Sequence, residues 1–135
     1  IAETPTSEAN ETANDAPAAI TIDFSTATAA NPFVVFGAID DNTDFDDFFA
    51  FTLAATRTVT IQIQFAGTGG GGATNPDIDL LVCNAVCSAW VSTAGATAAQ
   101  PENITLTNQA AGTYNIYVNG WDTGGTTRPY KLIVY

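Results

Sequence analysis

The chain has 135 residues, a formal net charge of −11 at pH 7, 46% hydrophobic residues and no histidine. This length and hydrophobic content predict a single folded domain, and the charge disfavours nucleic acid and anionic membrane surfaces as partners, since both bind basic patches. The absence of histidine excludes Ser-His-Asp and Cys-His catalysis and any zinc site built on imidazole.

Residues 1–17 are polar and acidic and contain Pro5 and Pro17, which interrupt regular structure. They predict an N-terminal arm, which is either a linker or a segment pinned onto the domain, ahead of a β-sandwich domain at 18–135. The chain contains no methionine. This composition is expected of either a processed mature protein or an excised domain.

Alternation of apolar and polar residues dominates the rest of the chain and is typical of half-buried strands. Strands are expected at residues 20–24, 33–36, 49–53, 59–65, 78–82, 104–106, 114–118 and 130–134. About eight short strands with Gly and Asn turns predict an all-β fold, an antiparallel β-sandwich. The glycine-rich segment 67–76 is expected to be a flexible connector. No stretch reaches the roughly 18 apolar residues of a membrane span, so no membrane insertion is expected.

Cys83 and Cys87 bracket three residues. A hairpin loop of that length would bring the two cysteines face to face, so we expect a disulfide, which implies an oxidising compartment. Two reduced structural thiols are the alternative. A zinc site is disfavoured, because two thiolates alone cannot complete one.

Five aspartates crowd residues 40–47, directly before the apolar strand at 49–53. Crowded carboxylates repel one another unless a cation lies among them, and the chain has only three basic side chains. A hard metal ion is therefore expected, and carboxylate oxygens suit calcium. The spacing is not that of an EF-hand, because Phe45 stands where its glycine is required. A second acidic cluster at residues 8–17 of the arm could share the ion and dock the arm.

The order of elements resembles the bacterial pre-peptidase C-terminal domain, which is related to the collagen-binding domains of secreted collagenases. The resemblance covers about residues 8–135 and rests on segments 14–17, Gly37, 47–53, 59–61, 77–82, 111–118 and 130–134. It implies a jelly-roll-like β-sandwich without catalytic activity. The cysteines and the glycine-rich segment are not expected features of that family.

The calcium-binding members of that family chelate the ion with a Glu/Asn/Asp arm and an Asp-x-x-Asp pair. By this resemblance the ligands here are Asn14 and Asp15 from the arm and Asp44 and Asp47 from the pair. Further candidates are Glu11, which lies one residue further from Asn14 than the closest arm pattern, and Asp40 and Asp46, which are either ligands or solvated loop charges.

Other residues carry weaker signals. Asp77 and Asp79 share one face of a strand, where they are either solvated side chains or a second cation site. A glycosidase would need two such carboxylates on either side of a cleft, and the sequence gives no sign of a cleft, so we expect no enzymatic activity. A ligand platform could be formed by Tyr117, Trp121, Tyr135 and Trp90, unless these rings pack in the core or at its rim. N-glycosylation triplets begin at Asn10 and Asn103.

The sequence thus predicts a secreted or cell-surface, calcium-stabilised, non-catalytic β-sandwich. One interpretation is a structural or adhesive subunit that self-associates through its arm or an edge strand into a filament or layer. The alternative is an accessory C-terminal domain of a secreted peptidase, which binds a polymer such as collagen or polysaccharide or aids secretion.

Overall fold

The computed structural model describes residues 5–7, 15–18 and 20–135, which form two five-stranded β-sheets. The strands are β1 (Pro5–Ser7), β2 (Ile20–Thr21), β3 (Phe33–Ile39), β4 (Asp46–Leu53), β5 (Arg57–Phe65), β6 (Asp77–Asn84), β7 (Trp90–Gly95), β8 (Glu102–Gln109), β9 (Gly112–Asp122) and β10 (Arg128–Val134). Within the described residues, no helix is long and apolar enough to cross a membrane.

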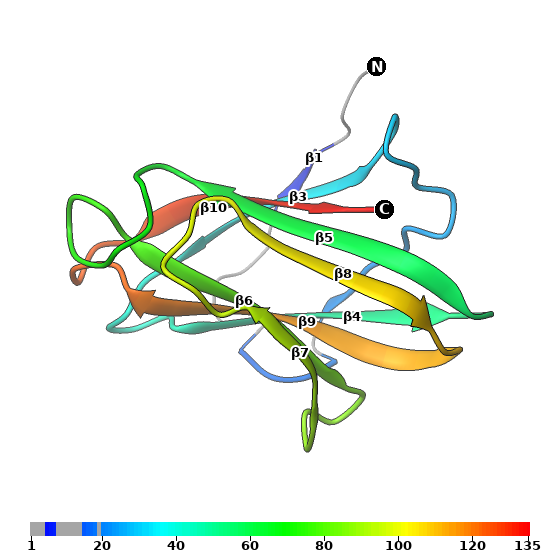
Figure 1. The fold of residues 1–135 in the computed structure, drawn as a ribbon. Helices are drawn as coiled ribbons and strands as arrows, with labels where there is room; N and C mark the ends of the chain where they lie inside the picture. The colour runs from blue at the N-terminus through cyan, green and yellow to red at the C-terminus, as the bar shows by residue number, and fades with distance from the viewer. Residues whose placement is uncertain (1–4, 8–14, 19) are drawn as a thin grey trace.

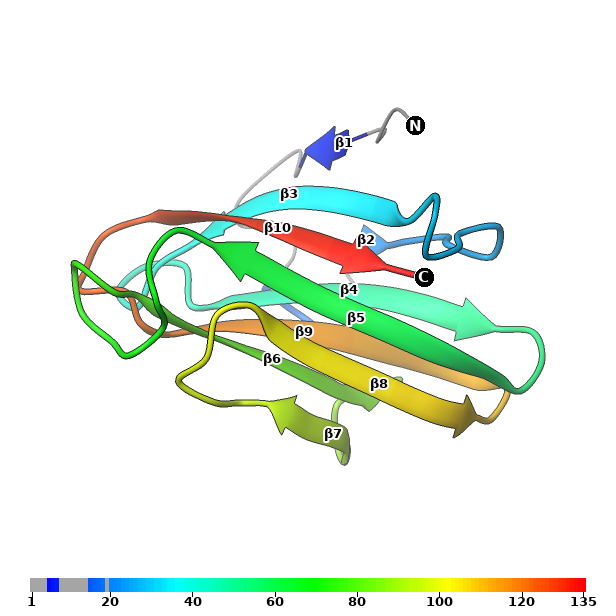
Figure 2. The same ribbon diagram turned by 45° about the horizontal axis from the view of Figure 1, so that its top comes forward.

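The two sheets pack face to face as the layers of a sandwich (Figure 1). One has the strand order β1-β3-β10-β5-β8, which Figure 2 shows most clearly, and the other has the order β2-β4-β9-β6-β7. All pairings among β3 to β10 are antiparallel, while the short edge strands β1 and β2 pair in parallel with β3 and β4. The predicted all-β sandwich of about eight main strands is confirmed.

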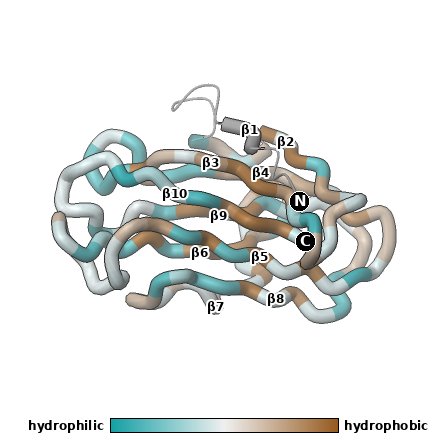
Figure 3. Tube along the Cα trace, turned by 90° about the horizontal axis from the view of Figure 1, so that it is seen from above, coloured by the Kyte–Doolittle hydropathy of each residue, from teal (hydrophilic) through white to brown (hydrophobic). Residues whose placement is uncertain are grey.

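The alternation of side chains along each strand builds the core between the sheets. On β5, Val59, Ile61 and Ile63 are fully buried, whereas Gln62 and Gln64 point to the outer face and are partly exposed. Figure 3 shows such hydrophobic segments recurring along the central strands, with mostly pale or hydrophilic loops at the left end of the view. Each large aliphatic side chain buried in this way contributes about 1.5–3 kcal/mol.

The strand expected at residues 20–24 is shorter than predicted. Strand β2 holds only Ile20 and Thr21, and the Ile22 amide still donates a hydrogen bond to the Ala50 carbonyl of β4, yet both Ile22 and Phe24 are buried in the core. The alternation of apolar residues therefore predicted correctly which side chains are buried, but it overestimated the length of the strand. The reason is that β2 is an edge strand, and beyond Ile22 the chain turns away in a loop held by a hydrogen bond from the Ala27 amide to the Phe24 carbonyl.

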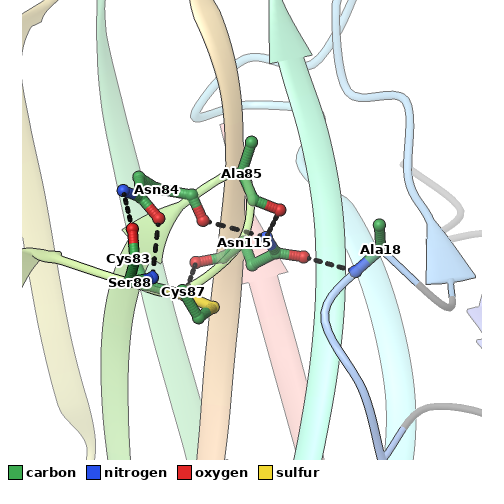
Figure 4. Close-up of a disulfide and its surroundings, with 7 residues drawn as sticks. All are labelled: Ala18, Cys83, Asn84, Ala85, Cys87, Ser88 and Asn115. Atoms are coloured by element: carbon green, nitrogen blue, oxygen red, sulfur yellow. Dashed lines mark hydrogen bonds between the residues drawn. A yellow bond between two sulfur atoms is a disulfide. The ribbon is translucent and has the colours of Figure 1, made fainter.

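The expected disulfide joins Cys83 and Cys87, with their Cα atoms 4.9 Å apart (Figure 4). The expected three-residue hairpin is wrong. Strand β6 continues to Asn84, β7 begins at Trp90, and Cys83 lies opposite Trp90 in the sheet. Cys87 instead lies in the turn, where Asn84 accepts hydrogen bonds from the amides of Cys87 and Ser88. The disulfide therefore fastens the turn to the end of β6.

Candidate metal centre and aromatic face

The loop 40–45 between β3 and β4 is braced by two of its own aspartates. The Asp40 carboxylate accepts hydrogen bonds from the amides of Asn42 and Thr43 at 2.7 and 2.6 Å and from the Thr43 hydroxyl at 2.9 Å. The hydrogen bond from the Thr43 amide is the main reason that the pKa of Asp40 is lowered. Asp40 is thus engaged in shaping its own loop.

The second brace, Asp41, joins this loop to the one that follows β9. Its carboxylate accepts hydrogen bonds from the amides of Thr123, Gly124 and Gly125 at 3.0, 3.1 and 2.8 Å. Burial raises the pKa of Asp41, but the hydrogen bonds from Gly125 and Thr123 outweigh it and lower the pKa below its ordinary value. The close approach of this loop to β9 also requires a glycine at position 120, because a Cβ atom on Gly120 would lie 2.8 Å from the Asp40 carbonyl oxygen.

Three carboxylates gather beside this braced loop. Asp15, Asp44 and Asp47 each offer one oxygen, and these oxygens all lie within 4.8 Å of one another. Asp47 is fully buried at the start of β4, and both carboxylate oxygens of Asp44 are shielded from solvent. The third member, Asp15, comes from the segment that precedes β2, the strand that pairs in parallel with β4 from Ile20 opposite Phe49.

The buried Asp47 is held from the opposite sheet. The Tyr130 hydroxyl on β10 donates a hydrogen bond to Asp47 Oδ2 at 2.5 Å, across the interior of the sandwich. Tyr130 is itself buried. A hydrogen bond between a neutral hydroxyl and an ionised carboxylate is among the stronger kinds, and here it fixes the direction in which the carboxylate points.

Replacing Tyr130 by phenylalanine should lower the free energy of unfolding by about 2 kcal/mol, because Asp47 would lose a buried donor to its charge. The matched control is Tyr114→Phe, whose hydroxyl donates to the neutral Ala110 carbonyl at 2.9 Å and should cost about 1 kcal/mol. Urea denaturation in calcium-free buffer measures both. A loss for Tyr130→Phe no larger than for the control would contradict the assigned role of this hydroxyl.

The other predicted ligands are placed differently or lie outside the described residues. Asp46 Oδ1 accepts hydrogen bonds from the Tyr117 hydroxyl at 2.6 Å and the Asn119 amide at 3.0 Å, on the outer face of the sheet. Asp40 and Asp46 are therefore not members of the three-carboxylate cluster. Glu11 and Asn14 lie outside the described residues, and their roles as ligands stay predictions.

The outer face of the β2-β4-β9-β6-β7 sheet carries a row of aromatic rings. Tyr117 on β9 stacks on Phe48 of β4, with ring centroids 4.7 Å apart, and on Trp90 of β7, with centroids 5.7 Å apart. Trp90 is 54% exposed, and Trp121, further along β9, is 69% exposed. We call Phe48, Tyr117, Trp90 and Trp121 the aromatic face.

Three of the four platform residues expected from the sequence thus share one face, and Tyr135 does not. Tyr135 follows β10 in the other sheet and exchanges backbone hydrogen bonds with Thr60 of β5. Phe48 was missed, although the alternation of Phe49, Phe51 and Leu53 on the buried face of β4 places Phe48 on the opposite face. The register, with Phe48 opposite Tyr117, brings it into the aromatic row.

Asn103, the glycosylation candidate among the described residues, lies exposed on β8. Its side chain accepts a hydrogen bond from Gln62 at 2.7 Å and donates one to the Pro101 carbonyl. Attachment of a glycan at Asn103, or at Asn10, which lies outside the described residues, stays a prediction.

The model of the bacterial pre-peptidase C-terminal domain family matches residues 45–120, which is more than half of the chain. No curated protein matches significantly. Among solved structures, the chain is similar to the pre-peptidase C-terminal domain of a collagenase from Bacillus anthracis, with 14% identity, a TM-score of 0.60 and coverage of 100% of this chain and 98% of that one.

Two further solved structures are more distant. A periplasmic inhibitor of g-type lysozyme from Aeromonas hydrophila has 17% identity, a TM-score of 0.44 and coverage of 98% and 97% of the two chains. The carbohydrate-binding module CBM36, solved with calcium and xylotriose, has 19% identity, a TM-score of 0.39 and coverage of 73% and 76%. These two similarities are too low to support an argument, and the collagenase domain shows a shared fold alone.

Proposed function

The chain belongs to the bacterial pre-peptidase C-terminal domain family, and from this premise we propose that it is a non-catalytic accessory module of a secreted protein, one that binds an extracellular polymer. The disulfide supports an oxidising, extracellular location. The family match supports this accessory role more directly than it supports self-assembly into a filament or layer.

The aromatic face is the observation that carries the proposal. Trp90 and Trp121 leave large apolar surfaces in water, a cost that binding would recover. Tryptophan and tyrosine also dominate binding energies, because a large rigid ring gains contact area at little cost in conformational entropy. The stacked row crosses from β4 over β9 to β7, so it offers an extended surface and not an enclosed pocket.

An extended surface of this kind suits a chain-like ligand, which repeats its contacts along its length. Collagen is the first polymer to test, since the similar domain from Bacillus anthracis is part of a collagenase. Polysaccharides are the second, because flat rings offer stacking surfaces to sugars. Pull-down of the protein on insoluble collagen, chitin and cellulose tests the proposal. Retention on at least one polymer is expected, and retention on none would overturn the proposal.

We also propose that Asp15, Asp44 and Asp47 hold a calcium ion that fastens the arm to the sandwich. The donor set fits, because three carboxylates with two of them shielded from water offer the hard oxygen ligands that calcium prefers. Calcium takes six to eight oxygens, so the predicted ligands Asn14 and Glu11, backbone carbonyls and water would complete the site. Bound calcium supplies the positive charge that relieves repulsion among the three carboxylates.

Self-association is a second candidate with one specific observation behind it. Strand β1 of the arm forms the edge of its sheet and pairs in parallel with β3, so β3 accepts an extended segment on that side. The arm of a second copy could pair there in the same way. Sedimentation velocity and negative-stain microscopy of the pure protein test this: polymers are expected if the arm is exchanged, and monomers alone would exclude it.

A further inference from the structure

A second acidic pocket lies beside the aromatic face, away from the three-carboxylate cluster. Asp77 and Asp79 begin β6, Glu102 begins β8, and Trp121 stands on β9 next to β6. A cavity of about 230 Å³ is lined by Asp77, Asp79, Thr97, Trp121 and the alanines on either side of Thr97.

Asp77 is the unusual member of this pocket. Its side chain is only 9% exposed, and its Oδ1 atom is buried with no hydrogen-bond partner among the described residues. Leaving a buried polar atom without a hydrogen-bond partner destabilises the fold, and more so when the group is charged. Asp77 lines the cavity, so the carboxylate that contains this atom lies at the edge of a space large enough for a ligand.

Glu102, which lies close to this pocket, is a buried carboxylate that does have hydrogen-bond partners. It is 2% exposed and accepts hydrogen bonds from the Thr97 hydroxyl at 2.7 Å and the Ala99 amide at 3.0 Å. Glu102 thereby holds the segment after β7 against the pocket. It contributes negative charge to the pocket but does not supply the donor that Asp77 lacks.

The charges favour a cation over any other ligand. Burial raises the pKa of Asp77, and the charge of Asp122 raises it further. Burial, Asp77 and Glu102 raise the pKa of Asp79 to about 6. Carboxylates crowded in this way repel one another, and a cation bound between them would relieve the repulsion.

The basic side chains of the protein are committed elsewhere. Arg57 lies over the ring of Phe24, Arg128 bonds to the carbonyls of Ala73 and Thr123, and Lys131 is on β10, two strands away from β8. None of these three side chains lines the pocket.

We propose that Asp77 and Asp79 bind a hydrated divalent cation under Trp121, with the Thr97 hydroxyl as a further oxygen donor. Carboxylate, hydroxyl and water oxygens make calcium the best-matched ion. Two carboxylates and a hydroxyl do not fill the coordination shell of calcium, and the cavity leaves room for the water molecules that would complete it. This site is separate from the Asp15, Asp44 and Asp47 cluster, which lies at the start of β4, with β9 between β4 and β6.

Terbium luminescence tests this proposal, because Tb³⁺ replaces calcium and emits when an adjacent indole is excited. The chain has two tryptophans, and Trp121 lines the pocket. Indole-sensitised emission should appear on adding Tb³⁺, be displaced by calcium, and fall at least tenfold in Asp77→Asn/Asp79→Asn. Asp44→Asn/Asp47→Asn is the matched control and should keep the emission. Trp121→Phe should lose the emission but keep calcium binding.

Isothermal titration calorimetry with calcium provides the second readout. The Asp44→Asn/Asp47→Asn protein should show one remaining binding event, and adding Asp77→Asn/Asp79→Asn should remove it. No emission from the wild-type protein, or emission unaffected by Asp77→Asn/Asp79→Asn, would overturn the proposal. Polymer binding is not required for either readout, so failure of this inference is distinguishable from failure of the proposed function.

Discussion

Chelation of calcium by EDTA should lower the melting temperature of the protein by about 10 °C. Extracellular modules bind calcium with dissociation constants near 10⁻⁴ M, so about 10 mM calcium is roughly a hundredfold excess over that constant. Such an excess stabilises the folded state by about 2.7 kcal/mol, and for a domain of this size each kcal/mol moves the melting temperature by several degrees. Thermal denaturation in calcium and in EDTA measures the shift.

The Asp15, Asp44 and Asp47 cluster is expected to carry most of that shift. Asp44→Asn/Asp47→Asn removes two charges but keeps the shape of the side chains, and the amide oxygen introduced at position 47 can still accept the hydrogen bond from Tyr130. The variant should lose most of the EDTA response. In EDTA it should melt above the wild-type protein, because the repulsion among the carboxylates is relieved.

The matched comparison is Asp77→Asn/Asp79→Asn, which should retain most of the EDTA response. Adding Asp44→Asn/Asp47→Asn to it should make the melting temperature independent of EDTA. A wild-type protein that melts at the same temperature in calcium and in EDTA would refute the proposed calcium site at Asp15, Asp44 and Asp47.

Substitution of Trp90 by alanine should weaken polymer binding about 30-fold, which corresponds to a loss of about 2 kcal/mol for a central aromatic contact. Trp90 is more than half exposed and lies on an edge strand, so its loss should change the melting temperature little. Cosedimentation with the polymer that retains the wild-type protein measures the change in affinity.

The control for the aromatic face is Phe36→Ala. Phe36 is an exposed aromatic residue on β3 in the opposite sheet, 39% accessible, and is not part of the aromatic face. The affinity of this variant for the polymer should equal that of the wild-type protein. Equal weakening by Trp90→Ala and Phe36→Ala would place the binding surface elsewhere or show that binding is non-specific.

The main strands could be predicted from the sequence because their alternation is strong. The spacing of Val59, Ile61 and Ile63 alone predicts one buried face, and they form one. Strand β7 could not be predicted in this way, since its residues 90–95 have no alternating apolar set. Its position is determined by pairing with β6 at the sheet edge, a long-range contact that local composition does not report.

The candidate metal centre was only partly predictable. Chemistry and resemblance pointed to Asp15, Asp44 and Asp47, which the fold brings together. The Tyr130 hydroxyl was missed because its partner Asp47 is 83 residues away in the other sheet. The same reason applies to Asp41, whose carboxylate resembles its acidic neighbours in the sequence but is occupied by amides of a distant loop.

The most direct test of the polymer-binding role is a nuclear magnetic resonance titration of the labelled protein. The two indole N–H signals, from Trp90 and Trp121, report on the aromatic face, and the side-chain amides of Gln62 and Gln64 report on the outer face of the opposite sheet. Adding a triple-helical collagen peptide or an oligosaccharide of chitin or cellulose should shift both indole signals and leave the glutamine amides unchanged. Shifts confined to the glutamine amides, or no shift with any of these ligands, would contradict the proposed role.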